Sequence, residues 1–305
     1  MEKRRIGSLS VSVVGLGCNN FGMRLDEAAT ARVVDAALSK EINFFDTADI
    51  YGGTRSEEFL GRALGKRRGQ VVLATKFGLP IDEQRKGARP EYVKQALEAS
   101  LRRLGTDHID LYQLHRPDPE VPIADTLGAL DDLVKAGKVR EIGCSNFDAA
   151  QIDAASHAAR GARFVSVQNE YSLLHRAPEA GVLEASLRHG LAFLPYFPLA
   201  SGVLTGKHAK GARPSGTRLS DAKSQLAGRF LSDRNLEIAA RLQQFASQRG
   251  HTLLELAFSW LLARPAVASV IAGATSPEQV ADNVRAAQWA PSREDMDEID
   301  RLTAK

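Results

Sequence analysis

Four residues that could move a proton lie near the ends of three short apolar segments. Asp46 follows the run INFF, with Tyr51 five positions later; Lys76 follows VVLAT, and His115 follows IDLYQL. A neighbouring lysine ammonium lowers the pKa of a tyrosine phenol from about 10 towards neutral pH. The set therefore predicts that Tyr51 protonates a carbonyl oxygen as a general acid. Asp46 would orient Lys76, and His115 would orient the carbonyl or share the proton.

The apolar segments that carry these residues belong to a series of eight expected strands. They are 13–16, 43–45, 71–75, 109–114, 139–144, 164–168, 191–196 and 267–272, separated by helix-length segments such as 27–40, 90–105 and 123–137. Repeated strand–helix units form parallel sheets, and eight of them close into a (β/α)8 TIM barrel, whose active site lies at the carboxyl ends of the strands. An open, doubly wound sheet is the structural alternative.

Two further segments are expected outside this repeat. Short apolar runs on either side of Gly7-Ser8 predict an N-terminal β-hairpin that precedes or plugs the barrel. Between the seventh and eighth strands, residues 201–229 have no clear period, and we expect a long βα loop there that acts as a functional lid.

Polar or small residues follow nearly every expected strand. They are Gly17-Cys18-Asn19, Asp46, Lys76, His115, Ser145-Asn146, Gln168-Asn169, Tyr196 and Gly273-Ala274-Thr275. Each one alone is equally typical of a helix cap or a turn, but the whole series indicates a barrel enzyme.

Some of these groups suit a nicotinamide. Ser145, Asn146 and Gln168 offer hydroxyl and amide groups to a carboxamide, and Tyr196 offers an aromatic face to a flat ring, although a core aromatic at the barrel rim is an equal alternative. The run GLGCNNFG lacks the G-x-G-x-x-G spacing, so a dinucleotide would be held outside a Rossmann fold.

Composition excludes several other classes. The 40 Lys and Arg are interleaved with 37 Asp and Glu, giving a net charge of +3, so no nucleic-acid partner is expected. Two cysteines suit reduced thiols rather than a disulfide framework. No signal peptide or membrane-spanning run is found. We expect one cytoplasmic barrel domain over 1–305, with no membrane partner and no metal site.

Taken with these residues, the chain resembles the aldo-keto reductase family. The matching stretches are GLGCNNFG, FFDTADIYGGTRSEEFLGRAL, VVLATKFG, IDLYQLHRPDP, GKVREIGCSNF, VQNEYSLLHR, PYFPLASGVLTGK and VIAGATSPEQVADN. The resemblance implies a (β/α)8 barrel that binds NAD(P)(H) and reduces aldehydes or ketones to alcohols. It also implies the roles already given for Tyr51, Lys76, Asp46 and His115.

The resemblance further implies a cofactor site, with NADPH expected and NADH possible. Its residues are Gly17, Cys18, Asn19, Asp46, Tyr51, Ser145, Asn146, Gln168, Tyr196, Phe197, Pro198, Leu199, Ala200, Gly202, Leu204, Lys207, Arg218, Gly273, Thr275, Gln279, Asp282 and Asn283. Where many members carry Lys-Ser and Arg for a 2′-phosphate, this chain has Gly273-Ala274 and Gln279. It is similar in this to the branch of bacterial reductases and potassium-channel β subunits.

The expected partner is a small-molecule carbonyl substrate. Its pocket is expected to be formed by Asn20, Phe21, Ile50, Phe77, Arg116 and Tyr171, and to be open because the chain ends soon after a short helix. Two other functions remain open: a cofactor-binding regulatory subunit with the same barrel, and a Schiff-base lyase using Lys76 as nucleophile. The sequence gives no N-terminal extension for the regulatory role, and it leaves the oligomeric state open.

Overall fold

The computed structural model describes residues 1–208, 219–220 and 225–304. Eight parallel strands form a ring in the order β10-β3-β4-β5-β6-β7-β8-β9. They are β3 (Val14–Gly17), β4 (Phe44–Asp46), β5 (Val72–Phe77), β6 (Ile109–Leu114), β7 (Val139–Ser145), β8 (Phe164–Glu170), β9 (Ala192–Tyr196) and β10 (Val270–Gly273).

Contacts between β9 and the segment before β10 nearly close this ring. The backbone N–H of Phe193 donates to Ala266 O at 2.7 Å, and Ala268 N–H donates to Phe193 O at 3.1 Å. The fold is therefore the predicted (β/α)8 barrel, and the doubly wound alternative is wrong.

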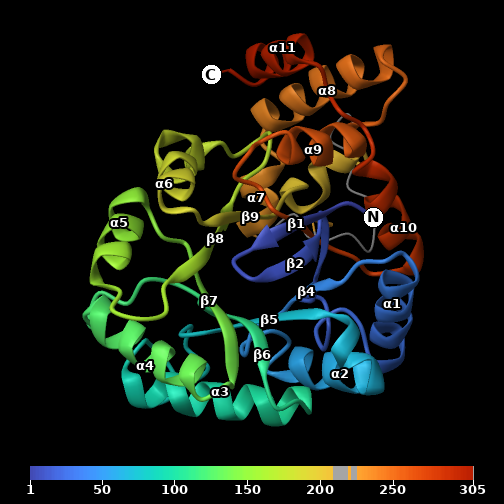
Figure 1. Cartoon of the computed structure of the whole chain (residues 1–305). Coiled ribbons are helices and arrows are strands. Elements are labelled where there is room, and N and C mark those ends of the chain that lie inside the picture. Colours follow the sequence, from blue (N-terminus) through green and yellow to red (C-terminus); the bar gives the residue numbers. More distant parts are fainter. Residues whose placement is uncertain (209–218, 221–224, 305) are drawn as a thin grey trace.

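Helices surround the strands, as Figure 1 shows. They are α1 (Glu27–Ser39), α2 (Arg55–Leu64), α3 (Pro90–Leu104), α4 (Ile123–Lys135), α5 (Ala149–Ala158), α6 (Val182–His189), α10 (Pro277–Ala286) and α11 (Arg293–Thr303), with short 3-10 helices η1 (Gly65–Gln70) and η2 (Ala177–Ala180). In α3, Pro90 is the first helical residue and Gly105 ends the helix with a left-handed φ of 62°. The apolar face of this helix, including Val93 and Leu97, is buried.

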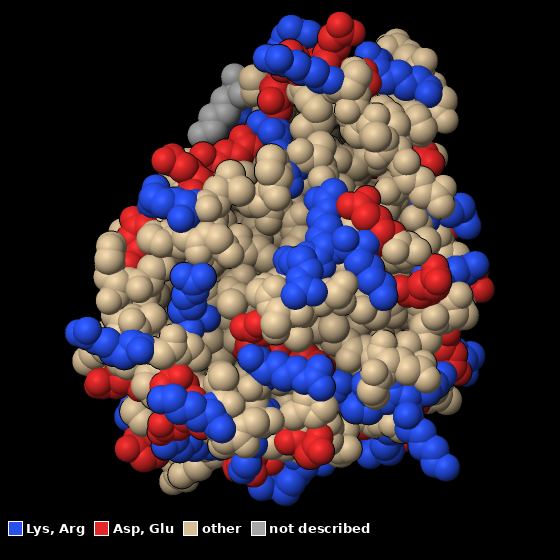
Figure 2. Space-filling model, in the orientation of Figure 1, with Lys and Arg blue, Asp and Glu red and all other residues tan. Residues whose placement is uncertain are grey.

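A hairpin of β1 (Lys3–Ile6) and β2 (Leu9–Ser12) lies in the middle of the ring. Its turn is at Gly7-Ser8, as predicted, and the Ser8 N–H donates to Glu141 Oε1 at 2.6 Å. Ile6, Leu9 and Val11 are buried in one apolar cluster with inward side chains of the barrel: Phe44, Ala74, Leu111, Leu194 and Ile271. The hairpin therefore plugs the amino end of the barrel, and charges of both signs are interspersed around it on the surface (Figure 2).

In the described part of the chain, four helical segments separate β9 from β10: η3 (Ala200–Thr205), α7 (Gln225–Phe230), α8 (Asp233–Gln248) and α9 (Leu253–Leu262). The short helices η3 and α7 form at the two ends of the stretch 201–229, where a long loop was expected. Residues 209–218 and 221–224 of that stretch lie outside the described part of the chain. Among the described residues, no helix combines the length and apolarity that a membrane span requires.

Candidate active site

A cavity of about 540 Å³ opens at the carboxyl ends of the strands. Its deep part is lined by Asp46, Tyr51 and His115, which follow β4 and β6. Lys76, near the end of β5, is completely buried beneath them. The strand-end arrangement expected of a barrel therefore brings the four proton-transfer candidates together.

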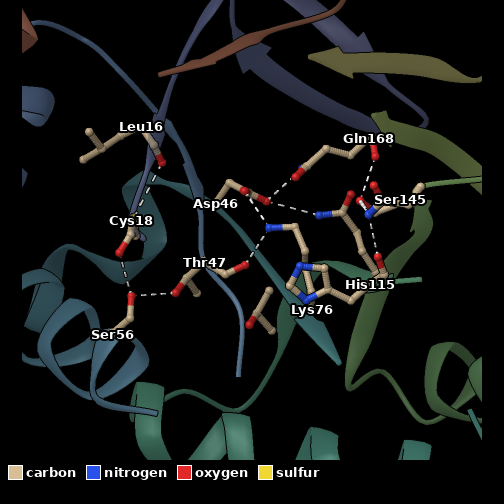
Figure 3. A network of polar contacts seen from close by, with 12 residues as sticks. Leu16, Cys18, Asp46, Thr47, Ser56, Lys76, His115, Ser145 and Gln168 are labelled. Carbon is tan, nitrogen blue, oxygen red and sulfur yellow. Dashed lines mark hydrogen bonds and ion pairs between the residues drawn. The ribbon is translucent and has the colours of Figure 1, made fainter. Parts of the chain in front are cut away.

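Asp46 and Lys76 form a buried ion pair whose remaining hydrogen-bonding groups are also used (Figure 3). Lys76 Nζ donates to Asp46 Oδ2 at 2.6 Å and to Thr47 O at 2.9 Å. The other carboxylate oxygen, Oδ1, accepts from the side-chain amides of Gln113 at 3.2 Å and Gln168 at 3.1 Å. A buried ion pair is tolerated when its lone pairs and protons are satisfied in this way.

Tyr51 lies against this ion pair. Lys76 Nζ is 5.2 Å from the centroid of its ring, and its ring meets that of His115 edge to face at 5.8 Å. Burial raises the pKa of Tyr51 above its ordinary value near 10, and the nearby Lys76 ammonium offsets only part of that rise. The expectation of a lowered pKa is therefore wrong, because desolvation of the phenolate outweighs the single positive charge. The phenol keeps its proton at neutral pH.

Lys76 and His115 are held in opposite charge states. Burial lowers the pKa of Lys76, but Asp46 and Tyr51 more than compensate and raise it above its ordinary value. Burial, with the charges of Lys76 and Arg116, lowers the pKa of His115 to about 2. At neutral pH the site therefore contains an ammonium ion and a neutral imidazole. In the described part of the chain no group bonds the buried Nδ1 of His115.

The four groups expected at the nicotinamide all line the cavity. Asn146 is the most constrained, because its Nδ2 donates to His115 O and Ser145 Oγ while its Oδ1 accepts from the Tyr196 hydroxyl at 2.8 Å. The Ser145 hydroxyl donates to Gln168 O at 2.7 Å. The Gln168 side chain donates to Asp46, and no described residue donates to its Oε1. Gln168 is therefore the group with most capacity left to bind an amide.

Most of the other residues expected to hold a cofactor also line the cavity. These are Gly17, Cys18, Asn19, Phe197, Pro198, Leu199, Gly202, Lys207, Gly273, Thr275, Gln279, Asp282 and Asn283. Ala200 and Leu204 do not: both are completely buried in the core, and their N–H groups donate to Phe197 O and Leu199 O. The turn after β9 therefore points both side chains into the core rather than into the cavity. Arg218 lies outside the described residues.

The expected substrate pocket is only partly present. Asn20 and Arg116 line the cavity, and Ile50 does not. Phe21, Phe77 and Tyr171 are completely buried in the hydrophobic core instead. Phe77 stacks on Tyr112 at 4.6 Å, and Tyr171 packs on Trp260 at 4.9 Å. The aromatic residues next to the strand ends therefore pack between sheet and helices rather than forming a wall of the cavity.

Sequence reasoning missed several residues that line the cavity: Arg24, Leu79, Leu254, Ile271 and Ala272. Leu79 lies three residues after Lys76, so the strand-end rule could have found it. Leu254 lies in the first turn of α9, where no sequence signal points to the cavity.

A second buried carboxyl, Asp49, was also missed. It is 1% exposed, and no described residue bonds either of its carboxylate oxygens. Burial, followed by the charge of Glu57, raises its pKa to about 7. Its backbone N–H donates to Lys76 O at 3.0 Å, which ties this turn to the end of β5.

The cavity lining fits a dinucleotide in two respects. The backbone after β9 is left-handed at Phe197, Ser201 and Gly202, with φ of 50°, 56° and 105°, and such strain is typical of sites where backbone approaches a ligand. Farther along, the exposed Lys207 lines the cavity without an ion pair to any described residue, as a phosphate site requires. Gln168 Oε1 at one end and Lys207 at the other suit a carboxamide and an anion respectively.

Comparisons with known proteins agree with this geometry. The model of the aldo/keto reductase family matches residues 13–304. A probable voltage-gated potassium channel subunit beta of Arabidopsis thaliana is 35% identical, over 95% of this chain and 92% of its own length. The uncharacterized oxidoreductase YrpG of Bacillus subtilis is 35% identical, over 96% and 93%. Protein tas of Escherichia coli is 32% identical, over 99% and 97%.

Proposed function

Since the chain belongs to the aldo/keto reductase family and is an oxidoreductase of that family, we propose that it reduces aldehydes or ketones to alcohols with NADPH, and that Tyr51 is the general acid. The observation that carries this proposal is the meeting of Tyr51, His115 and the Lys76–Asp46 pair at the deep end of one cavity. A carbonyl oxygen there would lie among a protonated phenol, a neutral imidazole and an ammonium ion.

Each proton-transfer residue has a distinct role in this proposal. Tyr51 holds its proton at neutral pH and gives it to the carbonyl oxygen as negative charge develops there. The Lys76 ammonium, kept charged by Asp46, stabilises the resulting phenolate. The neutral His115 orients the carbonyl oxygen by donating a hydrogen bond from Nε2. General acid catalysis of this kind is worth about 10²–10⁴ in rate.

A bound nicotinamide would supply the hydride that the carbonyl carbon accepts. Gln168, assisted by Ser145 and Asn146, would hold its carboxamide, and Tyr196 would face the ring. Lys207 and the backbone of the Pro198–Gly202 turn would hold the pyrophosphate. Gly273, Thr275, Gln279, Asp282 and Asn283 would receive the adenosine end.

The proposal has consequences for the cell. Both cysteines, Cys18 and Cys144, are buried free thiols, which suits the reducing cytoplasm where NADPH is abundant. We propose that the whole chain, residues 1–305, acts there as one reductase domain on small-molecule carbonyl substrates.

The direct test follows the loss of NADPH absorbance with a panel of neutral aldehydes, for the wild type and Tyr51→Phe, and repeats it with NADH. Turnover by the wild type that falls at least about tenfold in Tyr51→Phe, with NADPH affinity unchanged, is the expected result. A Tyr51→Phe variant that keeps more than about a tenth of the rate would contradict the assignment of the acid.

Two other outcomes separate the alternative functions. Tight NADPH binding without turnover would favour a cofactor-binding regulatory subunit; the similar Arabidopsis protein is a probable voltage-gated potassium channel subunit beta. Borohydride trapping of substrate on Lys76 would favour a Schiff-base lyase. The ion pair with Asp46 opposes that reaction, because it keeps the amine protonated.

A further inference from the structure

Beside the proton-transfer residues, the cavity contains a cation that the reduction itself does not use. Arg116 directly follows His115 at the end of β6, and both side chains line the cavity. His115 is buried whereas Arg116 is exposed. The positive charge of Arg116 contributes to lowering the pKa of His115. The guanidinium is therefore close enough to interact electrostatically with a group bound beside His115.

Arg116 differs from Arg103 and Arg229 in having no ion-pair partner among the described residues. Arg103 pairs with the buried Glu57 at 2.6 Å, and Arg229 pairs with Glu170 at 2.6 Å. Over residues 1–208, 219–220 and 225–304, no ion pair or hydrogen bond involves Arg116.

The acids of the cavity do not neutralise it either. The two that line it in the described part of the chain, Asp46 and Asp282, pair with Lys76 and Arg285. Among the described residues, the cavity wall next to His115 therefore carries a positive charge with no anionic partner.

We propose that the substrate is a carbonyl compound that also carries an anionic group, and that Arg116 binds this group while the carbonyl oxygen lies between Tyr51 and His115. The inference rests on the proposed reductase function. A guanidinium presents its N–H groups in a planar fork that matches a carboxylate or a phosphate. Both anions share this chemistry, so the test contains a separate arm for each.

Arg116 would act by recognition rather than by proton transfer. It never deprotonates at working pH, so it cannot replace Tyr51 as the acid. A charge-assisted hydrogen bond to a partly desolvated anion changes affinity about 10- to 100-fold. That preference should appear mainly in KM, because the anion is bound equally in the ground state and the transition state.

The first experiment compares 4-formylbenzoate with its uncharged methyl ester at saturating NADPH. The wild type should reduce the acid with a kcat/KM about 10- to 100-fold higher than the ester. Arg116→Ala should remove this preference through KM and leave the ester unchanged, and Arg116→Lys should keep part of it. Arg32→Ala, which removes the same charge from an exposed site on α1 outside the cavity lining, is the matched control.

The second arm compares glyceraldehyde 3-phosphate with glyceraldehyde. If Arg116→Ala abolishes the preference for glyceraldehyde 3-phosphate over glyceraldehyde but not that for 4-formylbenzoate over its ester, the substrate class is a phosphate ester. If it abolishes only the preference for 4-formylbenzoate, the substrate class is a carboxylate. The inference would be overturned if the wild type reduced the charged and the neutral aldehyde of each pair with equal kcat/KM. It would also be overturned if Arg116→Ala lowered kcat/KM equally for the charged and the neutral aldehyde. Either result would leave the reductase proposal intact.

A binding measurement makes the test independent of turnover. Calorimetric titration with 4-(hydroxymethyl)benzoate, the alcohol product, should show about tenfold weaker binding to Arg116→Ala than to wild type, with unchanged binding of its methyl ester. Unchanged affinity for the acid would contradict the inference even if no aldehyde were reduced. A loss of NADPH affinity in Arg116→Ala would instead assign this arginine to the cofactor.

Discussion

Two carboxyl groups three residues apart have opposite surroundings. Asp46 and Asp49 are both almost completely buried, 3% and 1% exposed. Asp46 accepts hydrogen bonds from an ammonium and two amides, whereas no described residue bonds the carboxylate of Asp49. Burial alone therefore does not determine the charge state of a carboxyl group: the donors on neighbouring strands do.

The difference follows from where the two side chains lie. Asp46 ends β4 inside the ring, where Lys76 of β5, Gln113 of β6 and Gln168 of β8 all reach it. Asp49 lies in the next turn, near Glu57, whose own carboxylate is used by Thr75 at 2.6 Å and Arg103 at 2.6 Å. Arg103 is thus paired with Glu57, and the pKa of Asp49 rises to about 7 because of burial and the Glu57 charge.

The largest effect on stability and rate is expected from Lys76→Met. This change would leave the buried Asp46 carboxylate without its cation, as the Asp49 carboxylate is. Removing one partner of a buried ion pair lowers the free energy of unfolding by about 3–5 kcal/mol, and here it should also lower the reduction rate about 10²–10⁴-fold. Urea unfolding and NADPH consumption measure the two losses. The double variant Asp46→Asn/Lys76→Met should regain stability but no activity. A single variant as stable as wild type would show that Asp46 does not need its cation.

Asp49→Asn should have the opposite effect and stabilise the protein above neutral pH. The pKa of Asp49 is about 7 in the folded chain against about 3.9 unfolded, so the folded state binds an extra proton between those values. Stability from this group is therefore present at pH 4 and is lost as pH rises through 7. At 1.36 kcal/mol per pKa unit the loss is on the order of 4 kcal/mol by pH 8.

Urea unfolding of wild type and Asp49→Asn at pH 5 and pH 8 measures this difference. The variant should gain most at pH 8, and a gain that is equal at both pH values would mean that Asp49 is already ionised in the folded state. Asp46→Asn is the control, and it should destabilise at both pH values.

The imidazole of His115 should give a pH dependence of stability opposite to that of the Asp49 carboxyl. Its pKa falls to about 2 in the folded state from about 6.5 unfolded, so the unfolded state binds the extra proton and stability is lost as pH falls below 6.5. In an Asp49→Asn background, acidification from pH 6.5 to 5 should cost about 1–2 kcal/mol. Adding His115→Asn should remove that slope, and a slope that persists would assign the titration to another group.

The smallest effect is expected from Gln113→Met. This change removes a hydrogen bond to Asp46, but it also removes Oε1 of Gln113, which is buried with no partner among the described residues. The two contributions are of similar size and opposite sign, so the net loss in urea unfolding should be under about 1 kcal/mol. Gln168→Met, whose Oε1 is not buried in this way, should cost more. Equal losses of unfolding free energy in the two variants would mean that the unbonded Oε1 of Gln113 does not destabilise the folded state.

Much of the barrel could be predicted because its signals are local. The strand Ile109–Leu114 and the helix starting at Pro90 have the predicted bounds, since apolar runs, a first-turn proline and a terminal glycine act within a few residues. The strand-end rule also brought Asp46, Tyr51 and His115 to one cavity, because parallel strands end on the same side.

What could not be predicted depends on packing between distant segments. Phe77 and Tyr171 were expected at the cavity, but their rings are buried against Tyr112 and Trp260, and the sequence alone does not say which side of a strand end faces the helices. The rise in the pKa of Tyr51 likewise comes from desolvation by the whole fold, which outweighs the one charge that the sequence shows. Asp49 was missed because nothing in a sequence reveals that a carboxyl lacks partners.

The plug at the amino end of the barrel has a consequence for the order in which the chain can be completed. Ile6 and Leu9 are synthesised well before Leu194 and Ile271, with which they pack in one cluster. Their apolar side chains therefore stay partly exposed until β9 and β10 have also been synthesised. Contacts so distant in sequence slow folding and leave aggregation-prone surface uncovered in the meantime. A chain truncated before β9 would never bury them.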